Sequence, residues 1–190
     1  GFYKADFHNA KVATKENPLA KKAVELARKA SGKVILATNP LFPRDGQLTR
    51  IGWIGLSESD FDLITSYESD SYCKPNPDYY KSICERMGVE SENCLMIGND
   101  EREDGYAARA AGLDTFLVTD CLIANDNYPC DCRRGTFEEM CSYLEGLAKH
   151  YNFSLDTPMK DLPEKIINVI FYGTGNEKVQ FSYERNYGHG

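Results

Sequence analysis

The chain has 190 residues, of which 42% are hydrophobic and 27% are charged, and its formal net charge is -7. This length supports a single domain with a sizeable core. The acidic balance argues against a general surface for nucleic acid or for an anionic membrane. No stretch is long and apolar enough to span a bilayer, and no secretory signal is evident.

The seven cysteines are odd in number and irregular in spacing. This pattern favours free thiols in a reduced, intracellular compartment, so we expect a cytoplasmic protein. Cys130 and Cys132 form a single C-x-C pair. A zinc site needs a second pair with chelating geometry, so zinc is the weaker alternative to ordinary thiols.

The first predicted elements are a helix and a buried strand. Asn17 suits the cap of a helix, Pro18 suits its first position, and Gly32 ends it, so we expect a helix over 18–31. Residues 33–39 are a short and nearly unbroken apolar run, which is typical of a buried strand. The alternation continues with strands at 62–66, 93–98 and 115–118 and with helices at 77–87, 103–111 and 137–150.

Alternating strands and helices with short links predict an α/β fold with a parallel sheet and right-handed crossovers. Thr136, with Glu139 three residues later, is a capping-box pattern that opens the last of these helices. After about residue 147 the alternation stops. Residues 161–163 predict the start of a short helix or turn, and residues 169–183 predict a β-hairpin with a Gly-rich turn.

Polar side chains follow the predicted strands at one edge of the sheet. Thr38 and Asn39 end the first strand, Lys74 lies in a turn ahead of a helix, and an acidic run from Asp100 to Asp104 follows a later strand. Ligands of open α/β sheets bind at this edge. A hydroxyl, an amide and an ammonium suit a phosphoryl group, and hard carboxylate oxygens suit Mg²⁺. The set therefore predicts a site for phosphate with a metal ion.

Each of these residues also has an ordinary structural explanation. Thr38 alone would be a strand-end hydroxyl, and Lys74 alone would be a solvated surface charge. The acidic run alone would be a charge cluster at a helix N-terminus. Their common order and their placement on the expected elements favour the phosphate site.

The same residues resemble the motifs of the haloacid dehalogenase (HAD) superfamily of hydrolases, over residues 1–147. Thr38 is similar to the second family motif, Lys74 to the third, and Gly98-Asn99-Asp100 with Asp104 to the fourth. The resemblance implies a Rossmann-like core and a Mg²⁺-dependent phosphatase that acts on a small phosphorylated metabolite. It implies that Thr38 and Asn39 hold phosphate, that Lys74 is catalytic, and that Asp100 and Asp104 hold the metal. Residues 1–17 would then be a cap remnant or linker, and residues 18–147 the incomplete core.

The first family motif, an Asp-x-Asp-x-Thr loop after a central strand, has no counterpart in this sequence. Its first Asp is the nucleophile that forms an aspartyl-phosphate. Without that strand, the strands that end at Thr38 and Asp100 would each have an unpaired edge, which is costly and prone to association. We therefore expect a chain that folds poorly alone, an oligomer or a partner chain that completes the sheet, a rearranged fold, or a chain that omits part of the protein.

Residues 148–190 resemble a stretch of UvrA, the damage-recognition ATPase of nucleotide excision repair. The resemblance rests on residues 153–158, 161–164, 172–175 and 181–184 and includes neither nucleotide-binding motifs nor zinc cysteines. It suggests a fused, truncated or composite chain, against the alternative of a chance hairpin. Two further hypotheses follow from it. One is a non-catalytic remnant or binding module, and the other is a DNA-associated role through this segment, against which the net charge argues. The sequence leaves the substrate and the oligomeric state open.

Overall fold

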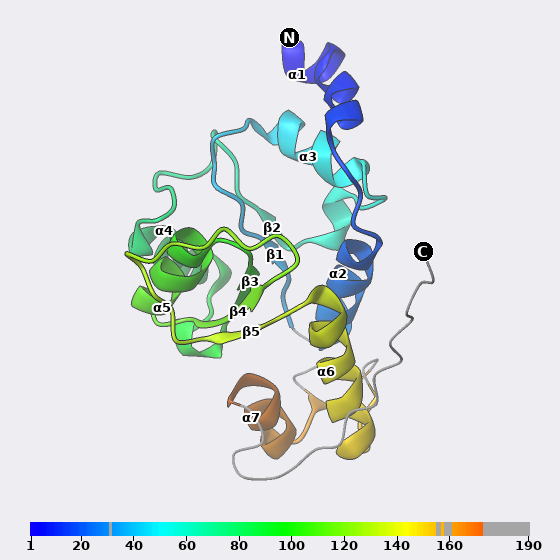
Figure 1. The fold of residues 1–190 in the computed structure, drawn as a ribbon, viewed down its shortest axis with the longest axis vertical. Helices are drawn as coiled ribbons and strands as arrows, with labels where there is room; N and C mark the ends of the chain where they lie inside the picture. The colour runs from blue at the N-terminus through cyan, green and yellow to red at the C-terminus, as the bar shows by residue number, and fades with distance from the viewer. Residues whose placement is uncertain (31, 155–156, 158–160, 173–190) are drawn as a thin grey trace.

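A computed structural model describes residues 1–30, 32–154, 157 and 161–172. Figure 1 shows strands near the centre with helices on both sides. The helices are α1 (Phe2–Ala5), α2 (Pro18–Ala30), α3 (Arg44–Gly52), α4 (Pro77–Met87), α5 (Ala107–Ala110), α6 (Phe137–His150) and α7 (Glu164–Tyr172). Shorter 3₁₀ segments are η1 (Phe7–Ala13), η2 (Glu58–Asp60) and η3 (Ser91–Asn93), and η4 (Glu101–Tyr106) is a π-helix. The strands are β1 (Ile35–Leu36), β2 (Leu63–Ile64), β3 (Leu95–Gly98), β4 (Asp114–Val118) and β5 (Arg133–Gly135).

The strands are parallel, as the alternation of strands and helices predicts. Among the described residues, β1 pairs with β2 in one sheet, and β3, β4 and β5 form a second sheet in that order. The predicted α/β class is confirmed. Within the described ranges, no strand pairs with the free edge of β1 or with that of β3.

The side chains of β1 and β3 alternate between two helical layers. Leu36 of β1 packs in a cluster with α2 and α3, whereas its neighbours Ile35 and Ala37 pack against α4 and α5. In β3, Met96 faces the α4 side and Ile97 faces α2 and α6. This period of two is expected of strands that are covered on both faces.

The two strands that flank the expected gap, β1 and β3, are less buried than β4. Leu117 and Val118 of β4, which lies between β3 and β5, are 0% and 1% exposed. Every residue of β3 and both residues of β1 are only half-buried. The partial burial of β1 and β3 agrees with the gap expected between the strands that end at Thr38 and Asp100.

The predicted helix boundaries agree best with the structure where the sequence contains both start and stop signals. α4 covers 77–87 as expected, with Asn76 accepting a hydrogen bond from the main chain of Asp78 and with Gly88 left-handed at φ 61°. α6 begins as predicted. Thr136 and Glu139 exchange the two bonds of a capping box, at 3.1 and 2.8 Å.

Several local predictions are wrong. The β-hairpin prediction fails at its first arm, because residues 169–172 belong to helix α7. Leu162, Ile166 and Val169 recur at helical spacing, and they pack together beside residues of α6. Residues 173–183, the rest of the predicted hairpin, lie outside the described residues.

Other elements were not anticipated or have different bounds. Residues 2–13 and 44–52 are helical, β5 was not predicted, and the helix expected over 103–111 is a π-helix followed by the short α5. The predicted strands at 33–39 and 62–66 shorten to residue pairs, since the Thr38 amide bonds the Thr65 side chain rather than a strand backbone. No helix in the described ranges is long and apolar enough to cross a membrane.

Candidate functional site

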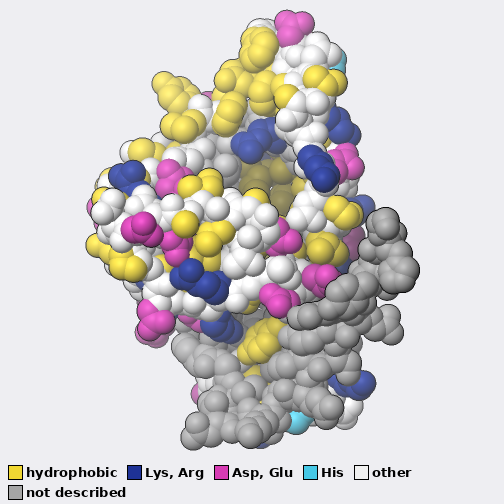
Figure 2. Space-filling model, viewed as in Figure 1, with side chains coloured by type: hydrophobic (Ala, Val, Ile, Leu, Met, Phe, Trp, Pro, Cys, Tyr) yellow, Lys and Arg dark blue, Asp and Glu magenta, His cyan; other side chains and the backbone are white. Residues whose placement is uncertain are grey.

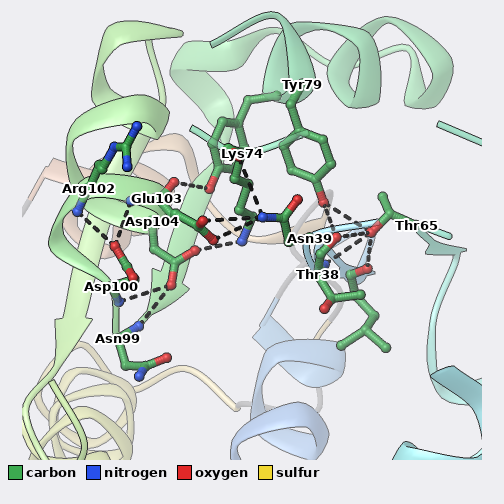
Figure 3. A network of polar contacts seen from close by, with 12 residues as sticks. Thr38, Asn39, Thr65, Lys74, Tyr79, Asn99, Asp100, Arg102, Glu103 and Asp104 are labelled. Atoms are coloured by element: carbon green, nitrogen blue, oxygen red, sulfur yellow. Dashed lines mark hydrogen bonds and ion pairs between the residues drawn. The ribbon is translucent and has the colours of Figure 1, made fainter. Parts of the chain in front are cut away.

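Three segments bring the predicted site residues together at the carboxyl ends of β1 and β3 (Figure 3). Asn39 follows β1, and its Nδ2 donates to both carboxylate oxygens of Glu103 on η4, at 3.2 and 3.3 Å. The Nζ of Lys74 lies 2.6 Å from Oδ1 of Asp104, which is also on η4. These contacts link the two sheets at the end where a parallel α/β fold binds its ligands.

Lys74 is a buried cation rather than a surface charge. Its side chain is 5% exposed, and that of its partner Asp104 is 9% exposed. The Lys74 ammonium also lies over the rings of Tyr79 and Tyr80, 5.7 and 5.6 Å from their centroids. Ion pairing and two aromatic faces therefore fix the ammonium in one position with little access to water.

Asp104 uses both of its oxygens inside the protein. Oδ1 accepts a hydrogen bond from Nζ of Lys74. Oδ2 accepts hydrogen bonds from the main-chain N–H groups of Asn99 and Asp100, at 3.0 and 3.1 Å. This arrangement makes Asp104 the residue that positions Lys74 and shapes the loop after β3. The metal role predicted for Asp104 stays a prediction.

Asp100 keeps one carboxylate oxygen available. Its Oδ1 caps η4 by accepting the N–H groups of Arg102 and Glu103, at 2.9 and 2.8 Å. No described residue bonds its Oδ2. Mg²⁺ commonly takes one or two carboxylates and completes its octahedron with water and phosphate oxygens. Asp100 therefore fits such an ion, although no group of three or more His, Cys, Asp or Glu residues in the described ranges could hold a metal alone.

Negative charge gathers at the site. Burial raises the pKa of Glu103, and the negative charge of Asp100 raises it further. Three carboxylates, on Asp100, Glu103 and Asp104, gather beside the ammonium of Lys74. A divalent ion at this point would offset the excess negative charge.

Thr38 is held by its main chain and leaves its hydroxyl available. Its carbonyl accepts from the hydroxyls of Thr65 and Tyr79, at 2.7 and 2.8 Å, and its N–H donates to Oγ1 of Thr65. No described residue bonds the Thr38 hydroxyl, so it can still bind phosphate. Asn39 differs, because its Nδ2 is engaged by Glu103. Its predicted role as a phosphate donor stays a prediction.

Thr65 and Tyr79 are positioning residues that the sequence analysis missed. Both are 0% exposed, and their hydroxyls lie 3.0 Å apart. Burial raises the pKa of Tyr79, which therefore stays a neutral hydrogen-bond donor. The only signals in the sequence were a threonine late in a predicted strand and a tyrosine pair soon after the Lys74 turn, and both patterns are common.

The first comparison concerns the α/β part of the chain. The model of the haloacid dehalogenase-like hydrolase family matches residues 2–112, which is more than half of the chain. A solved HAD phosphatase from Thermococcus onnurineus superposes with a TM-score of 0.60 at 21% identity, over 77% of this chain and 65% of that one. A HAD hydrolase from Bacillus subtilis, solved bound to magnesium, gives 0.55 at 23% identity, over 66% and 54%. At these identities the likeness is one of fold.

The second comparison concerns the C-terminal part. The model of the UvrA DNA-binding domain matches residues 133–190. The UvrABC system protein A of Borreliella burgdorferi is 58% identical over 41 residues, which cover 22% of this chain and 4% of that protein. The chain therefore spans only a small part of the curated relatives that it matches.

The two matches do not divide the structure cleanly. The UvrA match begins at β5, which pairs with β4 in the sheet, and it includes α6, which packs against α2. The predicted boundary at residue 147 falls within α6. The fold, the placement of Lys74 and Asp100 at the carboxyl ends of parallel strands, and the match over residues 2–112 together show that the chain belongs to the haloacid dehalogenase-like hydrolase family.

Proposed function

We propose that the chain forms the phosphate- and magnesium-binding part of a phosphohydrolase site that acts on small phosphorylated metabolites. The observation that carries this proposal is the Lys74 ammonium, which is buried and fixed by Asp104. The second oxygen of Asp104 holds the main chain of Asp100, whose own carboxylate keeps one oxygen free. A fixed ammonium stabilises charge on a phosphoryl group without reorganising during the reaction. The Thr38 hydroxyl would donate to a second phosphate oxygen.

The metal and the nucleophile complete the proposal. Asp100 would hold Mg²⁺ through Oδ2, and the bound ion would supply further charge neutralisation at the phosphate. The aspartate nucleophile would come from a strand that pairs with the free edges of β1 and β3. That strand would belong to a further segment of the protein or to a partner chain. The half-buried residues of β1 and β3 support this placement.

We expect phosphate and Mg²⁺ to bind the 190-residue chain cooperatively. Calorimetry should show phosphate affinity rising about tenfold or more at saturating Mg²⁺, since the ion and Lys74 act on the same phosphate. Asp100→Asn should abolish this gain. Glu164→Gln removes the same charge on α7, which lies away from the site (Figure 1), and should leave the gain intact.

The same samples should be assayed for release of phosphate from an aryl phosphate. Cooperative binding without release would identify a binding module whose nucleophile is supplied from elsewhere. Release that depends on Asp100 would show that the chain is a complete enzyme. Phosphate binding that is absent, or that is indifferent to Mg²⁺ and to Asp100, would contradict the proposal.

A second candidate function is DNA association through residues 133–190, which the match to the UvrA DNA-binding domain favours. Binding of a short duplex by the full chain, followed by fluorescence polarisation, should then weaken steeply between about 50 and 200 mM salt. That slope reports contacts between phosphates and Lys or Arg side chains. Undetectable binding at low salt, or binding indifferent to salt, would contradict this function.

A further inference from the structure

A cavity adjoins the proposed phosphate site on the α3 side. It encloses about 270 Å³ between the end of β1, α3 and residues 14–16, and Thr38 is part of its wall. Figure 2 shows a hollow on this face, with hydrophobic side chains at its floor and Lys or Arg side chains at its rim. The apolar part of the wall includes Leu36, Ile51 and Trp53. Such a mixture of apolar walls and few polar groups is typical of a small-molecule site.

Gln47 brings a buried, unpaired donor into this cavity. The residue is 2% exposed and lines the cavity, and its Nε2 has no hydrogen-bond partner among the described residues. Its Oε1 accepts from Nη1 of Arg50 at 3.4 Å, which orients the amide with Nε2 as the open end. A buried donor without a partner is costly, so a ligand with a hydrogen-bond acceptor at this point would be stabilised.

The charged groups around the cavity favour an acceptor that is anionic. Arg50 lines it, with its guanidinium over the Phe42 ring at 5.2 Å from the centroid, and Lys15 lines it from the segment before α2. The one acidic residue in the wall, Glu16, is paired with Lys11 at 2.9 Å. The small volume and apolar walls limit the occupant to a compact group.

We propose that this cavity binds a carboxylate of the same molecule whose phosphate lies at Thr38 and Lys74. The substrate class is therefore a compact phosphorylated carboxylic acid. Gln47 donates to a carboxylate oxygen through Nε2, and Arg50 supplies the opposite charge. Thr38 belongs to both the cavity and the phosphate site, so one short molecule reaches both. This inference rests on the proposed phosphohydrolase function.

Trp53 provides a direct readout, because it is the single tryptophan of the chain and lines the cavity. Three probes separate the two sites in titrations of the 190-residue chain with Mg²⁺. Malonate tests the cavity alone, inorganic phosphate tests the phosphate site alone, and phosphonoacetate tests both. Malonate and phosphonoacetate should change Trp53 emission, and phosphonoacetate should bind at least about tenfold more tightly than phosphate in calorimetry.

Gln47→Leu keeps the approximate shape of the side chain and removes the donor. It should lower the affinity for malonate and for phosphonoacetate about tenfold to a hundredfold, because a hydrogen bond to a charged group is lost. The affinity for phosphate should stay unchanged. Arg50→Gln should also lower the affinity for these two probes. Arg50 is exposed, so we expect this variant to fold normally. Arg109→Gln on α5 is the matched control, and it should bind all three probes as the unmodified chain does. Far-UV circular dichroism checks that each variant folds.

The outcomes separate this inference from the function on which it rests. Malonate binding that depends on Gln47 in a chain that fails to bind phosphate would preserve the carboxylate site and contradict the phosphohydrolase function. Normal phosphate binding with no response of Trp53 to malonate or phosphonoacetate would overturn the carboxylate site alone. Unchanged binding of both acids by Gln47→Leu and Arg50→Gln would overturn it as well. Tighter binding of methylenediphosphonate than of phosphonoacetate would overturn the choice of a carboxylate in favour of a second phosphate.

Discussion

Replacing Lys74 by methionine is expected to lower the free energy of unfolding by about 3–5 kcal/mol. The Lys74 and Asp104 side chains are 5% and 9% exposed and lie 2.6 Å apart. Methionine fills similar space but leaves the Asp104 carboxylate buried without its counter-charge, near Asp100 and Glu103. Urea denaturation at neutral pH, followed by far-UV circular dichroism, measures the loss as a lower midpoint at an unchanged slope.

Two companion variants make this result specific. Lys81→Met breaks an exposed pair with Asp78 on α4, whose side chains are 57% and 51% exposed, and should change stability by less than about 1 kcal/mol. Adding Asp104→Asn to Lys74→Met should recover part of the loss, because it removes the unpaired charge. Equal stability of Lys74→Met and Lys81→Met would show that the pair is not buried as described.

Gly98→Ala is expected to lower the free energy of unfolding about as much as Lys74→Met does, because of a steric clash. A Cβ at Gly98 would lie 2.5 Å from Cβ of Asp104 and would also overlap its carboxylate. Asp104 cannot move without giving up Lys74 and the main-chain N–H groups of the loop after β3. We expect a loss of about 3 kcal/mol or more, which combines overpacking with the broken pair. Mg²⁺-dependent phosphate binding should be lost with it.

Gly52→Ala is the matched control, because it makes the same chemical change at the last residue of α3. A Cβ there meets no atom within 4 Å. The substitution should be neutral or should stabilise the chain by about 0.4–1 kcal/mol, since alanine lowers the entropy of the unfolded chain. Both variants are compared by the same urea denaturation. A Gly98→Ala chain that unfolds at the midpoint of Gly52→Ala would contradict the predicted overlap.

The elements that the sequence predicted well are those set by local signals. α4 has a capping Asn76, a first-turn Pro77 and a closing Gly88, and α6 has its capping box, so neither depends on distant contacts for its bounds. The same applies to the edge on which the site lies. Polar residues that follow buried parallel strands share one end of a sheet, so Lys74 and Asp100 could be grouped from their positions alone.

The hairpin prediction at 169–183 shows where local signals mislead. The run from Val169 to Tyr172 is β-branched and aromatic, which favours a strand in isolation. The structure makes it helical, because Ile166 and Val169 recur with Leu162 at helical spacing and bury their side chains together beside α6. A short apolar run fits either element, and the surface that it can bury against decides between them.

By itself the sequence determined the parallel direction of the strands that it predicted, the bounds of its best-capped helices, and the edge at which polar groups gather. All of these follow from periodicity and capping within about a dozen residues. The sequence did not predict β5. Only the tertiary structure decided what those polar groups do. It assigned Asp104 to Lys74 and left one oxygen of Asp100 open, and it placed Gln47 in a cavity beside Thr38. Such roles depend on which atoms meet across segments far apart in the chain, and no local pattern encodes that.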